Sequence, residues 1–255
     1  MFSRRQQECM MSSDAIWQRY GESDPYYGVL TLDAYRKDNI AANKGAFFAS
    51  GERSVERVLA QVEAAVGPVR RDHAVDFGAG VGRLSLPLGR RFADVTSIDV
   101  SPGMLRELRS NATAQSVPNL TLCNRVDEVS KPIDFAMSLI VLQHIDPQRG
   151  RDVILGIADR LAPGGVLALD VPIMSRRSRG WHLVRRLRDR VPFAQTAWNL
   201  LRGRPLHDGG MQMNLYPVAE ITEALFARGM ASVTLLPTEP DPYFAGALIV
   251  CRKAG

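Results

Sequence analysis

Short apolar runs alternate with amphipathic stretches through the middle of the chain. The apolar runs favour strands at 74–77, 94–100, 120–124, 133–139 and 165–171. The stretches between them favour helices at about 83–91, 103–114 and 147–161. Because strands that alternate with helices form parallel sheets with right-handed crossovers, this pattern predicts an α/β fold.

The first 66 residues have a different pattern and are rich in aromatic side chains. Their last part, from Ser50 to Val66, has apolar residues on one helical face, and Ser50 or Ser54 could cap that helix. We expect residues 1–66 to form an N-terminal helical lid, and residues 67–255 to form the main domain.

The end of the chain adds a helix and two strands. The helix is expected to begin at Pro217, and the strands lie at about 231–236 and 243–251. The connection between these strands is short and rich in proline, so they should pair antiparallel. Residues 172–215 break the alternation and are expected to form an inserted cap, with a helix at about 180–202.

Composition and charge change this picture in one place. The chain has 255 residues, of which 45% are hydrophobic and 23% charged, as in ordinary globular proteins. It has no membrane-spanning run and no secretory signal, and its three scattered cysteines indicate a reducing cytoplasm. The net charge of +5 is uneven, because nine arginines and one acid between Pro172 and Pro205 give that segment +8 and leave −3 elsewhere.

The first predicted strand ends in the motif VDFGAGVGR, at residues 75–83. Glycines allow positive φ and a close approach of the backbone to a ligand, and ligands of α/β sheets bind at the carboxyl ends of strands. The dinucleotide fingerprint G-x-G-x-x-G needs a glycine at position 83, which is Arg83 here. The spacing G-x-G-x-G after Asp76 instead suits a ligand with a cationic amino-acid end and no pyrophosphate.

Together with VTSIDVSPGML, DFAMSLIVLQHI and LAPGGVLALDVP, this motif resembles the class I S-adenosylmethionine-dependent methyltransferases over about residues 73–171. The resemblance implies a Rossmann-like, mostly parallel seven-stranded sheet with an antiparallel last strand. It implies S-adenosylmethionine as cofactor, with S-adenosylhomocysteine as product. Asp99, 23 residues after Asp76, would accept the ribose hydroxyls. The other positions expected to contact the cofactor are Asp76, Gly78, Ala79, Gly80, Arg83, Val100, Met104, Val126, Asp127, Leu139 and Ile140.

The absence of certain motifs argues against some classes of methyl acceptor. Residues 138–141 stand where methyltransferases of adenine or amide nitrogen carry Asn/Asp-Pro-Pro-Tyr/Phe, and no cysteine lies where cytosine C5 methylation needs one. We expect a small-molecule or glycan-like acceptor, methylated at oxygen rather than nitrogen. The alternatives are an RNA methyltransferase that uses the basic segment and a non-catalytic protein that binds S-adenosylmethionine.

The arginine-rich segment has several interpretations. It favours an acceptor that is anionic or lipid-linked, or a peripheral membrane contact through 176–202. The plain alternative is a solvated helix packed by its apolar face. The segment shows no known RNA-binding module, which argues against a nucleic-acid partner.

An oxygen acceptor must lose its proton, and histidine is the usual base. His144 follows the fourth strand on the cofactor side and is the first candidate, with His207 as the second. His144 could instead be a buried histidine bonded to the backbone. No metal site is expected. The residues expected to contact the substrate are Gln143, Arg185 and three lid tyrosines that could also be lid core, Tyr20, Tyr26 and Tyr27.

Overall fold

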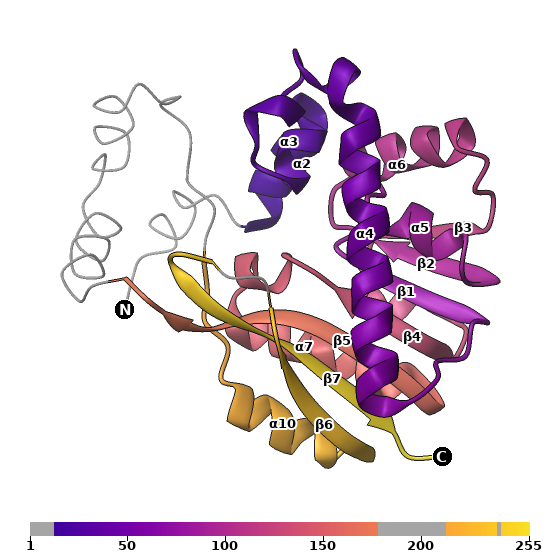
Figure 1. Ribbon diagram of the computed structural model, residues 1–255, viewed down its shortest axis with the longest axis vertical. Helices are drawn as coiled ribbons and strands as arrows, with labels where there is room; N and C mark the ends of the chain where they lie inside the picture. Colours follow the sequence, from indigo (N-terminus) through magenta and orange to yellow (C-terminus); the bar gives the residue numbers. More distant parts are fainter. Residues whose placement is uncertain (1–12, 178–212, 239–240) are drawn as a thin grey trace.

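Seven strands form one mixed sheet in the computed structural model, which describes residues 13–177, 213–238 and 241–255. The strand order is β3-β2-β1-β4-β5-β7-β6, and β7 runs antiparallel to both of its neighbours (Figure 1). This confirms the predicted Rossmann-like sheet with its antiparallel final pair. The strands are β1 (His73–Phe77), β2 (Asp94–Ile98), β3 (Leu120–Cys123), β4 (Ile133–Ser138), β5 (Leu161–Ser175), β6 (Met230–Pro237) and β7 (Phe244–Lys253).

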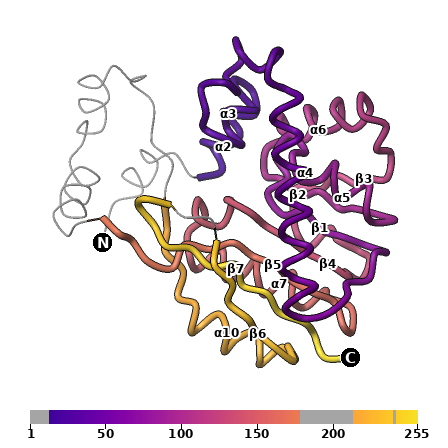
Figure 2. The backbone as a smooth tube through the Cα atoms, viewed as in Figure 1, coloured from indigo at the N-terminus to yellow at the C-terminus, as the bar shows by residue number. Residues whose placement is uncertain are grey.

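Helices cover both faces of the sheet. Helix α4 runs along one face, while α7 and α10 lie on the other (Figures 1 and 2). The helices are α2 (Ser13–Ser23), α3 (Pro25–Val29), α4 (Ile40–Val66), α5 (Ser85–Gly89), α6 (Pro102–Ala114), α7 (Pro147–Arg160) and α10 (Val218–Phe226). The described residues also form three 3-10 helices, which are η1 (Asp33–Tyr35), η2 (Val126–Glu128) and η3 (Leu142–His144).

Alternating side chains of the central strands supply the core on each face. In β1, Ala74 packs in the cluster under α4, and the next residue, Val75, packs in the cluster under α7 and α10. Phe135 and Ala136 of β4 divide in the same way. Because a strand buried on both faces is apolar at most positions, the parallel strands appear in the sequence as mainly apolar runs.

Strand β5 is longer than its apolar run suggests. Leu161 already pairs with Ile133, and the register then shifts before Phe135 pairs with Val166. The segment LAPGG, which precedes the strand predicted at 165–171, is therefore an irregularity within the observed strand, where Gly164 adopts φ of 76°. At its far end β5 extends because β7 pairs with it along its length.

Helix α4 begins earlier in the sequence than the helix predicted from Ser50 to Val66. It begins at Ile40, and neither Ser50 nor Ser54 caps it. Instead the Ser50 Oγ donates to the Phe47 carbonyl at 2.6 Å, and the Ser54 Oγ donates to the Ser50 carbonyl at 3.0 Å. The helix extends further because Phe47 packs edge-on against the rings of Tyr26 and Tyr35. The helix ends at Val66, and its second half packs against the sheet.

Several expectations concern parts of the chain that the structure does not describe. Of the expected cap at 172–215, only 172–177 and 213–215 are described. Arg185, His207 and the expected helix at 180–202 lie outside the described residues. Within the described part, no helix is both long and apolar enough to cross a membrane, and no three metal-binding side chains are grouped together.

Candidate active site

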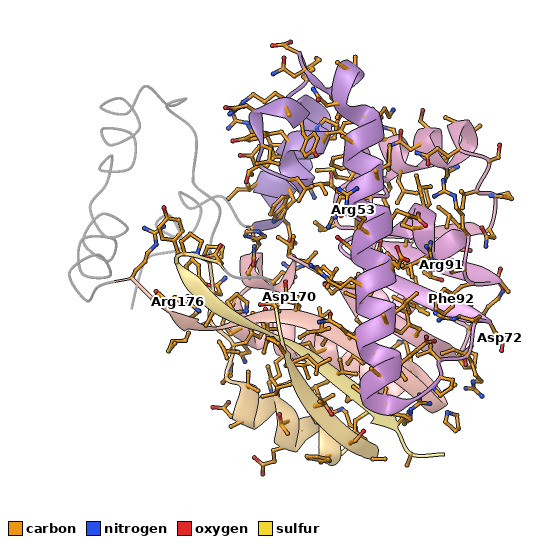
Figure 3. All side chains as sticks on the ribbon, viewed as in Figure 1. Arg53, Asp72, Arg91, Phe92, Asp170 and Arg176 are labelled. Atoms are coloured by element: carbon orange, nitrogen blue, oxygen red, sulfur yellow. The ribbon has the colours of Figure 1, made fainter. Side chains whose placement is uncertain are left out.

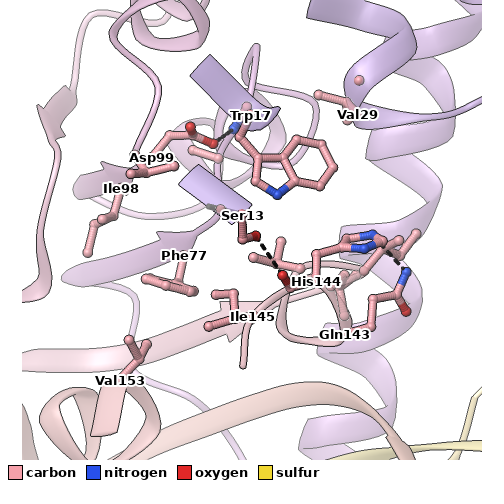
Figure 4. Close-up of a pocket in the computed structure, with 18 of the residues that line it drawn as sticks. Ser13, Trp17, Val29, Phe77, Ile98, Asp99, Gln143, His144, Ile145 and Val153 are labelled. Atoms are coloured by element: carbon pink, nitrogen blue, oxygen red, sulfur yellow. Dashed lines mark hydrogen bonds between the residues drawn. The ribbon is translucent and has the colours of Figure 1, made fainter. Parts of the chain in front are cut away.

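A cavity of about 1370 Å³ lies at the carboxyl ends of β1, β2 and β4. Its walls come from the glycine loop after β1, from η2 and η3, and from helices α2 and α7 (Figure 4). Pockets for single drug-sized ligands usually have volumes of roughly 300–1,000 Å³. This cavity therefore has room for two ligands side by side.

The glycine loop forms one wall with bare backbone. Gly78 and Gly80 have φ of 82° and 52°, in the left-handed region that favours glycine. A Cβ at Gly80 would lie 2.5 Å from Cγ2 of Val29, and a Cβ at Gly78 would overlap the side chain of Val141. The loop thus needs glycine for its conformation and for its close packing against two neighbouring segments.

Asp99 joins the glycine loop to the end of β2. Its Oδ2 accepts a hydrogen bond from the Gly80 N–H at 2.8 Å, and its Oδ1 accepts one from the Ser101 N–H at 2.9 Å. Burial raises the pKa of this carboxyl, and the two backbone hydrogen bonds oppose that effect. Each carboxylate oxygen has a second lone pair, so the side chain, which lines the cavity, can accept further bonds from ligand hydroxyls. Helix α6 is capped by Ser101, whose Oγ accepts from the Met104 N–H.

Asp76 lies beneath the loop and does not line the cavity. Its Oδ2 accepts a hydrogen bond from Ser85 Oγ at 2.6 Å, while Oδ1 has no partner among the described residues. Burial raises the pKa of Asp76 to about 6, despite the Ser85 hydrogen bond and the charge of Arg83. Burial also lowers the pKa of Arg83 to about 10. For both groups, loss of water outweighs their mutual attraction.

Every other residue expected to contact the cofactor lines the cavity. Val126 and Asp127 reach it from η2, and the carboxylate of Asp127 is paired with Arg125 at 2.7 Å. Ile140 reaches it from the turn after β4 and has φ of 63°, which is uncommon for a β-branched residue. The remaining members are Gly78, Ala79, Gly80, Arg83, Asp99, Val100, Met104 and Leu139.

His144 lies in η3 at the far side of the cavity, with its ring buried (Figure 4). Its Nε2 is 3.1 Å from Nε2 of Gln143, and its ring centroid is 5.1 Å from that of Trp17. The Ser13 Oγ donates to the His144 carbonyl at 2.7 Å. Helix α2 and η3 therefore hold this histidine from two sides.

The three lid tyrosines lie away from the cavity. Tyr26 is buried, and its hydroxyl lies 2.6 Å from Glu107 and 2.9 Å from Asn111. The guanidinium of Arg36 lies 3.9 Å from the ring centroid of Tyr27, and Tyr20 packs against its neighbours in the lid. This corrects their expected role, because their rings pack within the lid and none of them lines the cavity.

Other cavity residues had not been singled out as site residues in the sequence. Trp17 and Val29 come from the lid, and Tyr243 and Phe244 come from the start of β7. Four more come from one face of α7, where the i, i+4, i+7, i+11 spacing was the signal that could have identified them. These are Arg149, Val153, Gly156 and Arg160.

Comparison with known proteins agrees with this geometry. Residues 74–165 match a family model described as a methyltransferase domain. A probable cobalt-precorrin-6B C(15)-methyltransferase (decarboxylating) of Methanothermobacter thermautotrophicus is 27% identical over 157 residues, which cover 60% of this chain and 79% of that protein. An uncharacterized methyltransferase of Mycobacterium tuberculosis is 32% identical over 102 residues, which cover 40% of each protein.

Solved structures show the same fold. Magnesium protoporphyrin IX methyltransferase from Synechocystis PCC 6803, with bound S-adenosylmethionine, matches with a TM-score of 0.57 at 18% identity, over 95% of this chain and 98% of that one. The chain spans only 23% or 40% of the length of several curated relatives.

The cavity also fits the cofactor that this family uses. The carboxyl edge of the sheet carries the exposed backbone of the glycine loop. It also carries the carboxylate of Asp99, which can accept further hydrogen bonds. Residues 74–165 thus match a methyltransferase domain, and the chain has the fold of solved S-adenosylmethionine-dependent methyltransferases.

Proposed function

We propose that the protein transfers a methyl group to an oxygen atom of a small acceptor held against Trp17, Gln143 and His144. The observation that carries this proposal is the buried imidazole of His144, which lines the same cavity as the glycine loop and Asp99. In such a site the acceptor oxygen and its base would share one enclosed space.

The proposed binding roles follow the walls of the cavity. The loop from Gly78 to Gly80 would hold the methionine part of S-adenosylmethionine, and Asp99 would accept from the ribose hydroxyls. Val100 and Met104 would flank the adenine. When bound, the cofactor supplies a methyl group on a sulfonium, which is already a good leaving group. The protein must then mainly align the acceptor and exclude water.

His144 would remove the acceptor proton. An amide nitrogen can only donate, so the contact from Gln143 Nε2 makes His144 Nε2 an acceptor and leaves the ring hydrogen on Nδ1. An acceptor hydroxyl that displaces the Gln143 amide would therefore meet a lone pair on Nε2. Trp17 packs beside the ring and shields it from water.

The proposed size and the proposed charge of the acceptor rest on different observations. The cavity volume of about 1370 Å³ supports a small molecule, as do the similar proteins named for cobalt-precorrin-6B and magnesium protoporphyrin IX. The arginines and aspartates that line the cavity are equal in number, five of each. An anionic or lipid-linked acceptor, or a membrane contact through 176–202, is therefore proposed from the arginine-rich sequence alone.

The test is to supply methyl-labelled S-adenosylmethionine with panels of carboxylates, phenols, sugars and amines, and with RNA. We expect label on an oxygen of a small acceptor. His144→Ala should lower turnover by about 10²–10⁴-fold and leave the affinity for S-adenosylhomocysteine unchanged. His73→Ala is the matched control, because it removes another buried histidine, which does not line the cavity.

Three outcomes would contradict this proposal. Label that enters only RNA would favour the alternative of an RNA methyltransferase. Label that enters only amines would remove the need for a base. Cofactor binding with no transfer to any panel would favour a non-catalytic protein.

A further inference from the structure

A buried asparagine on α6 joins the lid to the glycine loop. Asn111 is 1% exposed, and its neighbours Leu108 and Ala112 belong to an apolar cluster. Its Nδ2 donates a hydrogen bond to the Val81 carbonyl at 3.0 Å, and its Oδ1 accepts one from the Tyr26 hydroxyl at 2.9 Å. A carbonyl can only accept, so the contact with Val81 fixes the orientation of the amide. One side chain thus bonds the loop with its nitrogen and the lid with its oxygen.

Val81 lies between two glycines of the loop, Gly80 and Gly82. Both have positive φ, of 52° and 93°. Glycine allows this conformation but does not hold it, because its backbone populates other regions as readily. The Gly80 N–H is held by Asp99, and the Val81 carbonyl is held by Asn111. Two side chains from outside the loop therefore fix its backbone across residues 80–81.

Tyr26 brings the lid into the same network. Its buried ring packs edge-on against Phe47, and the Val81 side chain belongs to the same buried cluster. Its hydroxyl also lies 2.6 Å from a carboxylate oxygen of Glu107, which is one turn before Asn111 on α6. The position of the lid and the conformation of the loop are therefore linked through the amide of Asn111.

The amide of Asn111 lies where an apolar side chain would extend the cluster on α6. A buried amide costs free energy unless its polar atoms are hydrogen-bonded. Asn111 does not line the cavity, so any effect that it has on a bound cofactor must pass through other residues. What the asparagine adds is therefore its pair of hydrogen bonds, one to the loop and one to the lid.

We propose that Asn111 is a positioning residue, whose amide holds the glycine loop in its cofactor-binding conformation and couples that conformation to the lid through Tyr26. The inference goes beyond the proposed function, because it concerns the cofactor half of the cavity and its test needs no acceptor. It can therefore fail while oxygen methylation stands, and the reverse.

The first test compares two replacements of Asn111 by calorimetry with S-adenosylhomocysteine. Asn111→Ala should weaken binding about tenfold, as expected for the loss of a buried hydrogen bond. Asn111→Asp should weaken it at least as much under alkaline conditions, because the carboxylate can accept from Tyr26 but cannot donate to Val81. Its loss relative to the native protein should lessen as the pH falls, because a protonated carboxyl can donate. Native affinity of Asn111→Asp under alkaline conditions would exclude the bond to Val81 as the cause.

A double-mutant cycle tests the link to the lid. Tyr26→Phe keeps the ring and removes only the hydroxyl, and it should weaken binding about threefold. In an Asn111→Ala background the same change should leave the affinity unchanged, because the hydroxyl then no longer contacts the group that holds the loop. Equal effects of Tyr26→Phe in the two backgrounds would overturn the coupling to the lid.

Asn119→Ala is the matched control for general destabilisation. The Nδ2 of Asn119 also donates to backbone carbonyls, and the residue does not line the cavity. Its acceptors are the carbonyls of Gly89, Phe92 and Ala93. Figure 3 shows Phe92 well away from the lid helices α2 and α3. Asn119→Ala should lower the melting temperature and leave the affinity unchanged.

Three results would overturn the proposal. The first is an unchanged affinity in Asn111→Ala, and the second is an equal loss of affinity in Asn119→Ala. The third applies if neither variant of Asn111 folds. Tyr26→Phe then tests the same network by itself, and native affinity in that variant would contradict the proposed coupling.

Discussion

The backbone N–H of Gly80 donates a 2.8 Å hydrogen bond to Oδ2 of Asp99. This bond joins the loop after β1 to the end of β2, which lies beside it in the sheet. The other carboxylate oxygen accepts from Ser101 at the start of α6. One side chain thus shapes the cavity wall and presents its lone pairs to a ligand.

Replacing Asp99 should affect both roles. Hydrogen bonds to charged groups are worth about 1.5–3 kcal/mol each, so Asp99→Ala should weaken the binding of S-adenosylhomocysteine at least tenfold. The melting temperature should also fall, because Gly80 and Ser101 lose their acceptor. Calorimetry measures the affinity, and Asp94→Ala, which removes an acid at the opposite end of β2 and away from the cavity, is the control that should leave it unchanged. An unchanged affinity would remove Asp99 from the cofactor site.

Gly80→Ala should abolish cofactor binding and destabilise the fold. The new methyl group would lie 2.5 Å from Cγ2 of Val29, and left-handed backbone costs roughly 1–2 kcal/mol for a residue with a Cβ. Adding Val29→Ala should restore part of the stability by removing the overlap, while the backbone cost remains. Chemical denaturation of the single and double variants separates the two effects. Full recovery in the double variant would show that the backbone conformation carries no cost.

The pH dependence of stability should report on Asp76. Burial raises its pKa in the folded protein to about 6 from 3.8. Because the folded state then binds the proton more tightly than the unfolded state does, protonation of Asp76 stabilises the fold. Its contribution is therefore complete below about pH 4 and is lost as the pH rises through about 6. Asp76→Asn, which is neutral throughout, should gain stability relative to the native protein over that range.

The size of this gain follows from the shift. One pKa unit corresponds to about 1.36 kcal/mol, so the difference between the two proteins should widen by on the order of 3 kcal/mol. Urea unfolding at several pH values between 4 and 8 measures it. A difference that stays constant with pH would mean that Asp76 has an ordinary pKa in the folded protein.

Tyr216→Phe should loosen the turn that carries His144. The Tyr216 hydroxyl donates to the Leu142 carbonyl at 2.8 Å and lies 3.2 Å from the Ile145 carbonyl, on either side of that histidine. A single hydrogen bond contributes about 0.5–1.5 kcal/mol net, so its loss should lower the melting temperature by roughly 1–6 °C for a chain of this size. Tyr243→Phe, at a half-exposed ring, should leave it unchanged. Equal melting temperatures for all three proteins would contradict the role of this bond.

The parts of the fold that the sequence predicted correctly depend on local patterns. Both faces of β1 and β4 are buried, so their apolar runs mark them without tertiary information. The glycine loop could also be predicted from local sequence, because Gly78 and Gly80 need positive φ at fixed positions. The role of Asp99 was implied by the family resemblance, and its contact with a cofactor stays a prediction.

The errors and omissions depend on contacts between distant segments. The predicted cap at Ser50 or Ser54 is wrong, because nothing local reveals that Phe47 packs against Tyr26 and lengthens the helix. The local sequence likewise does not reveal that the hydroxyl of Tyr26 lies 2.6 Å from Glu107, 81 positions away. Trp17 reaches the ring of His144 for an equally non-local reason.

The described chain leaves the cavity wall at Arg177 and returns to it at Met213. On return, the Asn214 N–H donates to the Gln143 carbonyl at 2.8 Å, and the Tyr216 N–H donates to the Pro172 carbonyl at 2.9 Å. The chain that returns at Met213 is therefore tied at once to the turn before His144 and to strand β5, so the acceptor side of the cavity and the sheet share one hydrogen-bonded frame.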